Sequence, residues 1–353
     1  MGLDAALDAA VADGLTGVVA VAAGPGFRWE GASGVADVKT GEALTQEHRF
    51  RIASVTKTFV AALVLQLVEE GTLELDGVAG PIAEGATIRQ LLNHTAGFPN
   101  FEDDVIAMFE PYRRDLAHRT ELGPDQMLAA VKSKPRRFPP GEGWSYSGSN
   151  FQILGLIVED VTGGSLREEL KRRIFDPLKL ADTELPPDGR PVAGMARGYL
   201  PPDNVLLPGP ELVDVTDLDL PYNPAGGGIV STARDVAAFL EALLGGRLHS
   251  PESRAELLGT VPSDWPESDG YGLGIERVTS LMGISPSPCG PAWGHLGFSA
   301  GYGTIALASE SGDRQVVVVT NGDIVTTDDH WDALGRLVWP AYCRSVPGTE
   351  TKV

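Results

Sequence analysis

Residues 50–59 decide the fold of this chain, and they read Phe50-Arg51-Ile52-Ala53-Ser54-Val55-Thr56-Lys57-Thr58-Phe59. Apolar residues then recur at helical spacing, which predicts a buried helix: Phe59, Val60, Leu63, Val64, Leu67 and Val68. Ser54 is a good N-cap or first-turn residue, so its hydroxyl is expected near the positive end of this helix. Lys57 follows three residues later and lies on the same face, one turn along.

The spacing of Ser54 and Lys57 has a catalytic interpretation. A serine hydroxyl is a poor nucleophile until a base removes its proton. A lysine in a dry, partly cationic pocket can lose its own proton and act as that base. The alternative is a capped helix with a solvated lysine, because Ser-x-x-Lys is common by chance. The other motifs of the chain decide between the two interpretations.

Composition excludes several classes of partner. The chain has 353 residues and a net charge of −20, from 48 acidic and 28 basic residues. Such a surface repels nucleic acids and anionic membranes. The longest apolar runs are too short to span a bilayer, and residues 1–13 lack the basic start and apolar core of a signal peptide. We therefore expect a cytoplasmic protein as the chain is written, or a secreted one whose signal was removed before the numbering.

The chain has two cysteines, Cys289 and Cys343, which are too few for a disulfide scaffold or a metal cluster. They are either buried free thiols or one bridge between a late loop and the C-terminal helix. We expect no metal and no organic cofactor.

The order of patterns predicts an α+β fold, with a little β structure first, a helical block next, and β hairpins and a terminal helix last. An antiparallel sheet with terminal helices is expected from residues 1–50 and 215–353, and a mostly helical region from 51–214. The active site would lie between them. Helices are predicted at 3–13, 87–94, 125–132, 150–161, 166–175, 231–244 and 331–342. Strands are predicted at 17–22, 27–35, 271–276, 292–295, 302–309 and 315–321, and residues 201–227 are expected to be irregular.

Three further clusters are candidates to meet Ser54. In Trp144-Ser145-Tyr146-Ser147-Gly148-Ser149-Asn150, a loop tyrosine before a helix could move the serine proton as a phenolate or in a phenol relay. In Trp293-Gly294-His295-Leu296-Gly297-Phe298, a histidine would add a donor facing Ser54, and the backbone N–H groups of Phe298 and Ser54 would form an oxyanion hole. The third cluster, Asn93-His94-Thr95-Ala96-Gly97, is interpreted as architecture, with His94 as general base the minority alternative.

Together these clusters resemble the serine penicillin-recognising enzymes, which comprise class C β-lactamases, DD-peptidases and their esterase and amidase relatives. The ordered signatures of that family are Ser-x-x-Lys, Tyr-x-Asn and Lys/His-x-Gly. Here they stand as Ser54-Val55-Thr56-Lys57, Tyr146-Ser147-Gly148 and His295-Leu296-Gly297. Similarity to actinomycete DD-carboxypeptidases extends over further segments, and the two cysteines lie close to where that enzyme has a disulfide.

The resemblance implies a role for each matched residue. Ser54 would be the acylated nucleophile and Lys57 its base partner. Tyr146 would shuttle the proton, and His295 would assist where β-lactamases usually have lysine. Which of Lys57 and Tyr146 takes the first proton is left open, because the two can titrate as a coupled pair.

Departures from the family pattern fall at the substrate-binding positions. Gly148 replaces an asparagine whose amide binds the acylamino group of the substrate. In the carboxypeptidase, two threonines and an arginine hold the terminal carboxylate of the substrate. Leu296 and Phe298 stand here in place of the threonines, and Glu276 in place of the arginine. Losing a charge-assisted hydrogen bond in a closed site costs about 1.5–3 kcal/mol, so recognition of D-Ala-D-Ala and penicillins should be weakened. Trp144 and Gly297 complete the expected substrate-binding set.

These observations predict acyl transfer through a covalent Ser54 acyl-enzyme. A small-molecule ester or amide would be the donor, and water or an amine the acceptor. An esterase or an amide-forming transacylase of natural-product biosynthesis is favoured, with an apolar collar from Phe298, Trp144, Phe98 and Phe101 that suits both. The first alternative is a D-alanyl-D-alanine carboxypeptidase or class C β-lactamase. The second is a non-catalytic penicillin-binding-like protein on the same fold.

Overall fold

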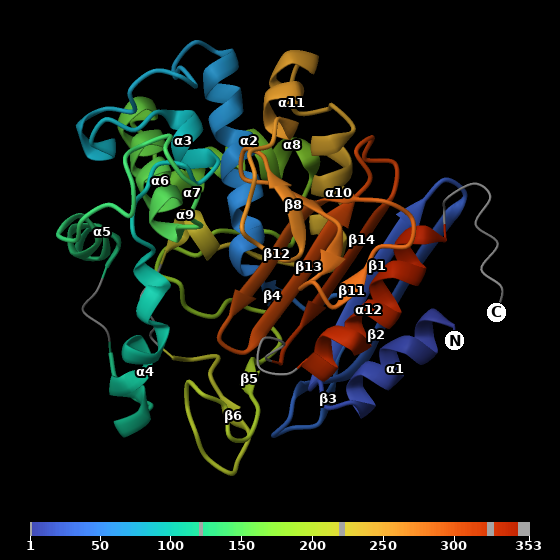
Figure 1. Ribbon diagram of the computed structural model, residues 1–353. Helices are drawn as coiled ribbons and strands as arrows, with labels where there is room; N and C mark the ends of the chain where they lie inside the picture. Colours follow the sequence, from blue (N-terminus) through green and yellow to red (C-terminus); the bar gives the residue numbers. More distant parts are fainter. Residues whose placement is uncertain (1, 120–122, 219–222, 323–327, 345–353) are drawn as a thin grey trace.

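An eight-stranded antiparallel sheet organises the molecule. The computed structural model describes residues 2–119, 123–218, 223–322 and 328–344 (Figure 1). The strand order is β3-β2-β1-β14-β13-β12-β9-β8, so the first and last thirds of the chain meet where β1 pairs with β14. The strands of this sheet are β1 (Gly17–Gly24), β2 (Phe27–Asp37), β3 (Glu42–Ala43), β8 (Ser268–Tyr271), β9 (Glu276–Val278), β12 (Ala292–Ser299), β13 (Tyr302–Ala308) and β14 (Gln315–Thr320).

Two terminal helices cover one face of the sheet. α1 (Leu3–Ala12) and α12 (Asp328–Cys343) contact each other and lie along the strands (Figure 1). Alternation along β1 sends Val18 and Ala20 into the cluster beneath these helices, while Val19 and Val21 point to the opposite face. The strand is therefore buried on both sides. This layer of terminal helices confirms the α+β architecture predicted from the order of the sequence patterns.

The opposite face of the sheet packs against α10 (Ala233–Leu244) and the helical part of the chain. At its centre lies α2 (Thr56–Glu69), in which nearly every side chain is buried. Around it are α3 (Ile88–Leu92), α4 (Val105–Arg114), α5 (Pro124–Lys132), α6 (Gly148–Thr162), α7 (Leu166–Leu170), α8 (Asp176–Leu178), α9 (Pro224–Gly227) and α11 (Pro251–Leu258). One hydrophobic cluster joins α2 and α6 to the sheet. The division of the chain into two regions, at residues 50/51 and 214/215, stays a prediction.

Short elements complete the described chain. Three small pairs of strands lie outside the main sheet: β4 (Phe50–Arg51) with β7 (Val230–Ser231), β5 (Tyr199–Leu200) with β6 (Val213–Asp214), and β10 (Ser280–Leu281) with β11 (Ser285–Pro286). The tight turns are η1 (Ala53–Val55), η2 (Pro81–Ala83) and η3 (Phe101–Asp104), and a π-helical turn, η4 (Lys171–Phe175), follows α7. No helix in the described part of the chain is long and apolar enough to cross a membrane.

The predicted strand over residues 271–276 is wrong, because this segment is the turn of a hairpin. β8 ends at Tyr271, β9 begins at Glu276, and these two residues pair across the turn. Gly274 has φ of +69°, and a Cβ there would lie 2.7 Å from Ala61 Cβ on α2. The close approach of the turn to α2 requires glycine at this position. The alternation of residues along one segment does not reveal this requirement. Residues 201–227, expected to be irregular, contain β6 and α9, and neither α4 nor α11 was predicted.

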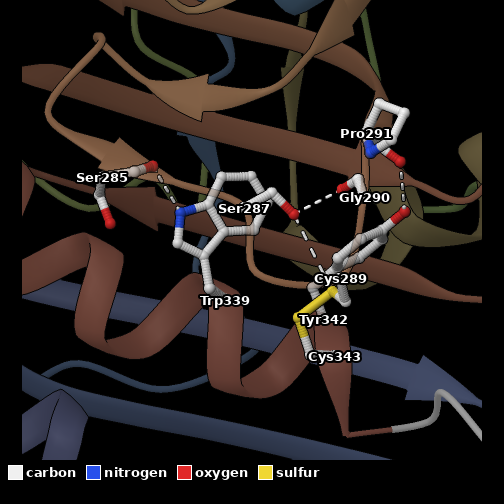
Figure 2. Close-up of a disulfide and its surroundings, with 8 residues drawn as sticks. All are labelled: Ser285, Ser287, Cys289, Gly290, Pro291, Trp339, Tyr342 and Cys343. Carbon is white, nitrogen blue, oxygen red and sulfur yellow. Dashed lines mark hydrogen bonds between the residues drawn. A yellow bond between two sulfur atoms is a disulfide. The ribbon is translucent and has the colours of Figure 1, made fainter. Parts of the chain in front are cut away.

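The cysteine pair forms a disulfide that joins the loop after β11 to the last turn of α12 (Figure 2). The Cα atoms of Cys289 and Cys343 lie 5.7 Å apart. Two hydrogen bonds from α12 support the same junction, from Trp339 Nε1 to the Ser285 carbonyl at 2.8 Å and from Tyr342 to the Pro291 carbonyl at 3.3 Å. Of the two alternatives that the sequence left open, the structure forms the bridge.

Candidate active site

Ser54 lies in the turn before the helix. η1 leads into α2, whose N-cap residue is Val55, and Ser54 makes no capping hydrogen bond. Ser54 therefore lies in the first turn of this helical segment, one of the two positions expected, but it does not cap the helix. Ala53, which precedes the serine, has φ of +47°. Left-handed backbone costs about 1–2 kcal/mol for a residue with a Cβ, and such strain clusters at functional sites.

Lys57 is buried beneath Ser54 and contacts its hydroxyl. Lys57 Nζ lies 2.9 Å from Ser54 Oγ and donates a hydrogen bond of 2.6 Å to the carbonyl of Gly226 in α9. Burial lowers the pKa of Lys57 to about 8, against the opposing effect of the charges of Glu102 and Glu276. Desolvation disfavours the ammonium form, so a neutral amine is accessible near neutral pH.

Tyr146 approaches the same oxygen from the loop before α6. Its hydroxyl donates a hydrogen bond of 2.8 Å to Ser54 Oγ. Burial raises the pKa of Tyr146 well above its usual value, and the charge of Glu102 adds to this effect. The side chain is therefore a neutral phenol that donates to Ser54 in the resting site.

The strand β12 lies against the serine turn, where Gly297 permits close approach. A Cβ on Gly297 would lie 2.4 Å from the Ile52 carbonyl and 3.2 Å from the Ser54 nitrogen. The backbone beside Phe298 is thus brought next to the Ser54 amide. An oxyanion hole formed by the Ser54 and Phe298 N–H groups stays a prediction that this contact supports.

Alternation along β12 separates the predicted residues onto two faces. Leu296 is 2% exposed and belongs to the cluster beneath α1 and α12. Phe298 packs on the same cluster, with its ring 5.4 Å from that of Trp331. The side-chain contacts to substrate expected of Leu296 and the collar position expected of Phe298 are therefore wrong, because both side chains point behind the sheet.

His295 points to the site face but makes no hydrogen bond to Ser54 in the described structure. Its Nε2 lies 3.0 Å from the hydroxyl of Tyr271, and its Nδ1 contacts the Leu296 carbonyl. The rings of His295 and Tyr146 are 6.2 Å apart. Burial lowers the pKa of His295 to about 3, so the imidazole is neutral. The expected donor facing Ser54 is thus not formed, and an assisting role for His295 stays a prediction.

Glu276 is completely buried beside His295. Its Oε1 lies 3.3 Å from His295 Nδ1, and its exposed fraction is 0%. Burial, reinforced by the charge of Glu267, raises the pKa of Glu276 well above its usual value. The sequence suggested a charge that meets the substrate directly. The structure instead places the carboxyl behind His295, away from any accessible surface.

The space beside Gly148 is filled by the Phe101 ring and by two amides, Asn100 and Asn223, that the sequence did not suggest. A Cβ on Gly148 would lie 2.9 Å from the Phe101 ring, 3.2 Å from Asn223 Nδ2 and 3.3 Å from Asn100 Oδ1. Asn223 donates to the Gly148 carbonyl, and Asn100 accepts from the Gly148 N–H. These two amides hold the backbone of Gly148. Their only signal in the sequence is a polar residue next to proline or phenylalanine.

An aromatic collar exists, but its membership differs from the prediction. Trp265 was missed, although its ring lies 4.5 Å from that of Tyr146 and 5.8 Å from that of Trp144. A lone tryptophan in the polar run 263–268 was its only signal. Phe98 is 1% exposed and carries the Arg136 guanidinium over its ring at 3.8 Å, so it is a core residue. Trp144 and Phe101 stay half-buried beside the Tyr146 loop.

The third cluster is architectural, as the sequence predicted. His94 Nδ1 accepts a hydrogen bond of 3.2 Å from the backbone N–H of Ser147, and Asn93 accepts from the Thr95 N–H. His94 is fully buried and has φ of +63°. Within the described residues, no group of three His, Cys, Asp or Glu side chains is placed to hold a metal ion.

Comparisons with known proteins identify the family and the fold. The model of the family described as Beta-lactamase matches residues 3–337. Esterase EstB of Burkholderia gladioli is 29% identical over 329 residues, which cover 83% of this chain and 77% of that protein. A D-stereospecific amidohydrolase from Streptomyces sp. has a TM-score of 0.81 at 29% identity, over 98% of both chains. The D-amino acid amidase of Ochrobactrum anthropi SV3, solved with D-phenylalanine, has a TM-score of 0.83 at 26% identity, again over 98% of both. The chain belongs to the beta-lactamase family and has its serine-hydrolase type of fold.

Proposed function

We propose that this protein is a serine acyl-transfer enzyme in which Ser54 takes the acyl group of an ester or amide and passes it to water or an amine. The observation that carries the proposal is the convergence of two proton-handling groups on one oxygen. Lys57 Nζ and Tyr146 Oη lie 2.9 Å and 2.8 Å from Ser54 Oγ. A nucleophile within hydrogen-bond reach of its base is the signature of covalent catalysis.

In the proposed mechanism, the neutral amine of Lys57 removes the Ser54 proton as Oγ attacks the carbonyl carbon. The lowered pKa of Lys57 and the raised pKa of Tyr146 both support lysine as the first base. The phenol of Tyr146 then gives its proton to the leaving group and regains one from the Lys57 ammonium. Water or an amine attacks the acyl-enzyme, and the same two groups move the proton in reverse.

The charge beside the site supports a substrate with a free ammonium group. Glu102 is exposed, follows the Phe101 ring that packs on Gly148, and raises the pKa of both Lys57 and Tyr146 through its negative charge. A carboxylate in that position attracts an ammonium and repels a carboxylate. Since two structural neighbours are a D-amino acid amidase and a D-stereospecific amidohydrolase, D-amino acid amides and esters are the donors that we favour.

Labelling of Ser54 tests the proposed chemistry. The intact protein is incubated with a fluorophosphonate or p-nitrophenyl acetate and analysed by mass spectrometry, with Ser54→Ala as control. We expect one covalent adduct on the Ser54 peptide and none on the variant. A wild-type protein without an adduct would rule out the enzyme and favour the non-catalytic alternative.

A donor panel tests the substrate class and the acceptor. D-phenylalanine amide, p-nitrophenyl acetate, nitrocefin and Ac₂-L-Lys-D-Ala-D-Ala are compared with and without an added amine. Faster ester consumption with the amine, together with an amide product, would establish the transacylase. Turnover of the peptide at ordinary carboxypeptidase rates would instead favour the cell-wall alternative.

A charge-neutral variant tests the role of Glu102. Glu102→Gln should raise KM for D-phenylalanine amide by up to about fivefold, because a solvent-exposed charge pair contributes about 0.2–1 kcal/mol. Hydrolysis of p-nitrophenyl acetate, which has no ammonium, should change little. Glu84→Gln removes a surface carboxylate that pairs with Lys132 and serves as the matched control. Equal effects of Glu102→Gln on both substrates would contradict ammonium binding.

A further inference from the structure

Four buried side chains form a row beside the Tyr146 ring and have no part in the proposed mechanism. Glu276, His295, Tyr271 and His94 are each 0–1% exposed. His94 Nε2 lies 3.2 Å from the Tyr271 hydroxyl, and that hydroxyl lies 3.0 Å from His295 Nε2. His295 Nδ1 then faces Glu276 Oε1 at 3.3 Å. Buried polar groups in a continuous row are costly unless each is satisfied, so their arrangement needs an explanation.

The hydrogen bonds in this row run in one direction. The backbone N–H of Ser147 can only donate, so His94 Nδ1 accepts and His94 carries its proton on Nε2. That Nε2–H donates to the Tyr271 oxygen, and the Tyr271 hydroxyl must therefore donate to His295 Nε2. The proton of His295 is left on Nδ1, directed at the Leu296 carbonyl and Glu276. Each tautomer is fixed by its neighbour.

The row is neutral along its length. Burial lowers the pKa of both imidazoles and raises that of Tyr271 well above its usual value. Glu276 also favours its protonated form because of its burial. The Leu296 N–H and His295 Nδ1 both approach its carboxyl group, but neither makes a hydrogen bond of good geometry. A neutral carboxyl still offers its carbonyl oxygen to the His295 N–H.

The two ends of the row touch the two halves of the site. At one end, His94 binds the backbone of Ser147, and its ring lies 4.5 Å from that of Tyr146. At the other end, His295 belongs to β12, two residues before the Gly297 backbone that lies against Ser54. The row therefore spans the gap between the proton-shuttle loop and the strand expected to bind the oxyanion.

We propose that Glu276 is a positioning residue for acylation of Ser54, which acts through His295, Tyr271 and His94 to hold the Tyr146 hydroxyl at hydrogen-bond distance from Ser54. The proposal rests on the proposed function, since it concerns the same reaction. A misplacement of about 1 Å in a catalytic group can cost about 100-fold in rate. Interruption of the row should thus slow acylation and leave substrate binding almost unchanged.

The test is a double-mutant cycle on the acylation of Ser54 by p-nitrophenyl acetate. Glu276→Leu removes the carboxyl group that faces His295 Nδ1 at 3.3 Å, and Tyr271→Phe removes only the hydroxyl in the middle of the row. Each should lower kcat about 10- to 100-fold with little change in KM. If both act through the same row, the double variant is no slower than the slower single variant. Multiplied effects would overturn the proposal.

Two further variants separate positioning from a general loss of structure. Glu276→Gln keeps an acceptor oxygen like that of the neutral acid and should retain most of the wild-type rate. A glutamine variant as slow as the leucine variant would overturn the proposal. Tyr302→Phe removes another buried hydroxyl, which donates to the Ala196 carbonyl at 2.9 Å outside the site, and should leave the rate unchanged. Thermal melting of every variant reports the fold independently.

The outcomes distinguish this inference from the proposed function. Wild-type protein without a Ser54 adduct would contradict the enzyme itself. If a correctly folded Glu276→Leu variant is acylated as fast as the wild-type protein, only the role of Glu276 is contradicted, and the proposed function stands.

Discussion

At the scale of single residues, the protonation of Lys57 determines when Ser54 can react. The neutral amine is the active form, and burial places its pKa at about 8. The rate of acylation should therefore rise about tenfold per pH unit up to about pH 8 and level off above it. Stopped-flow acylation by p-nitrophenyl acetate between pH 5.5 and 9.5 measures this dependence. The pKa of His295 is lowered to about 3. A change in the acylation rate centred near pH 6.5 would therefore contradict the assignment of Lys57 as the titrating base.

A second prediction at this scale concerns Gly297. A methyl group at this position would lie 2.4 Å from the Ile52 carbonyl, so the serine turn or β12 must move. Gly297→Ala should destabilise the protein by about 1–3 kcal/mol and slow Ser54 acylation more than tenfold. Urea unfolding and adduct formation measure the two effects. Gly209→Ala is the control, because a Cβ at Gly209 meets no atom within 4 Å. Similar behaviour of the two variants would show that close approach at Gly297 is unimportant.

At the scale of elements, the turn of the β8–β9 hairpin explains why residues 271–276 were misassigned. The turn is held against α2 by a hydrogen bond of 2.8 Å from Thr58 Oγ1 to the Gly274 carbonyl. Leu273 and Ile275 of this turn are apolar because they are buried in the core that they share with α2, not because they form one strand. Alternation alone cannot distinguish these two causes of apolar character.

The disulfide gives a prediction about the stability of α12. It closes a loop with a sequence separation of 54 residues, so loss of the bridge should cost about 4 kcal/mol in the chain-entropy account. The double variant Cys289→Ser/Cys343→Ser, compared with the wild type by urea unfolding, measures this cost. Titration of free thiols in the native wild-type protein should find none before reduction. An unchanged midpoint together with two reactive thiols would contradict the bridge.

At the scale of the whole molecule, one core joins the sheet to the helices on its site face. The cluster that contains Phe59 and Phe151 also contains Val19 and Val317 of the sheet. We therefore expect one cooperative unfolding transition, in which far-UV circular dichroism and tryptophan fluorescence change together in urea. Two separated transitions would favour the division at residues 50/51 and 214/215 as independent units.

The sequence by itself determined the family and the antiparallel sheet with its terminal helices, and it proposed Ser54, Lys57 and Tyr146 as site residues, which the structure brings together. These follow from local patterns, since Ser-x-x-Lys before an apolar helix and ordered motifs are properties of short segments. Only the tertiary structure decided which side chains meet. It placed Leu296 and Phe298 behind the sheet, brought Trp265 and Asn223 to the site, and buried Glu276 beside His295. Such contacts depend on which face each strand buries and on segments distant in sequence, and neither is encoded by the spacing within a single motif.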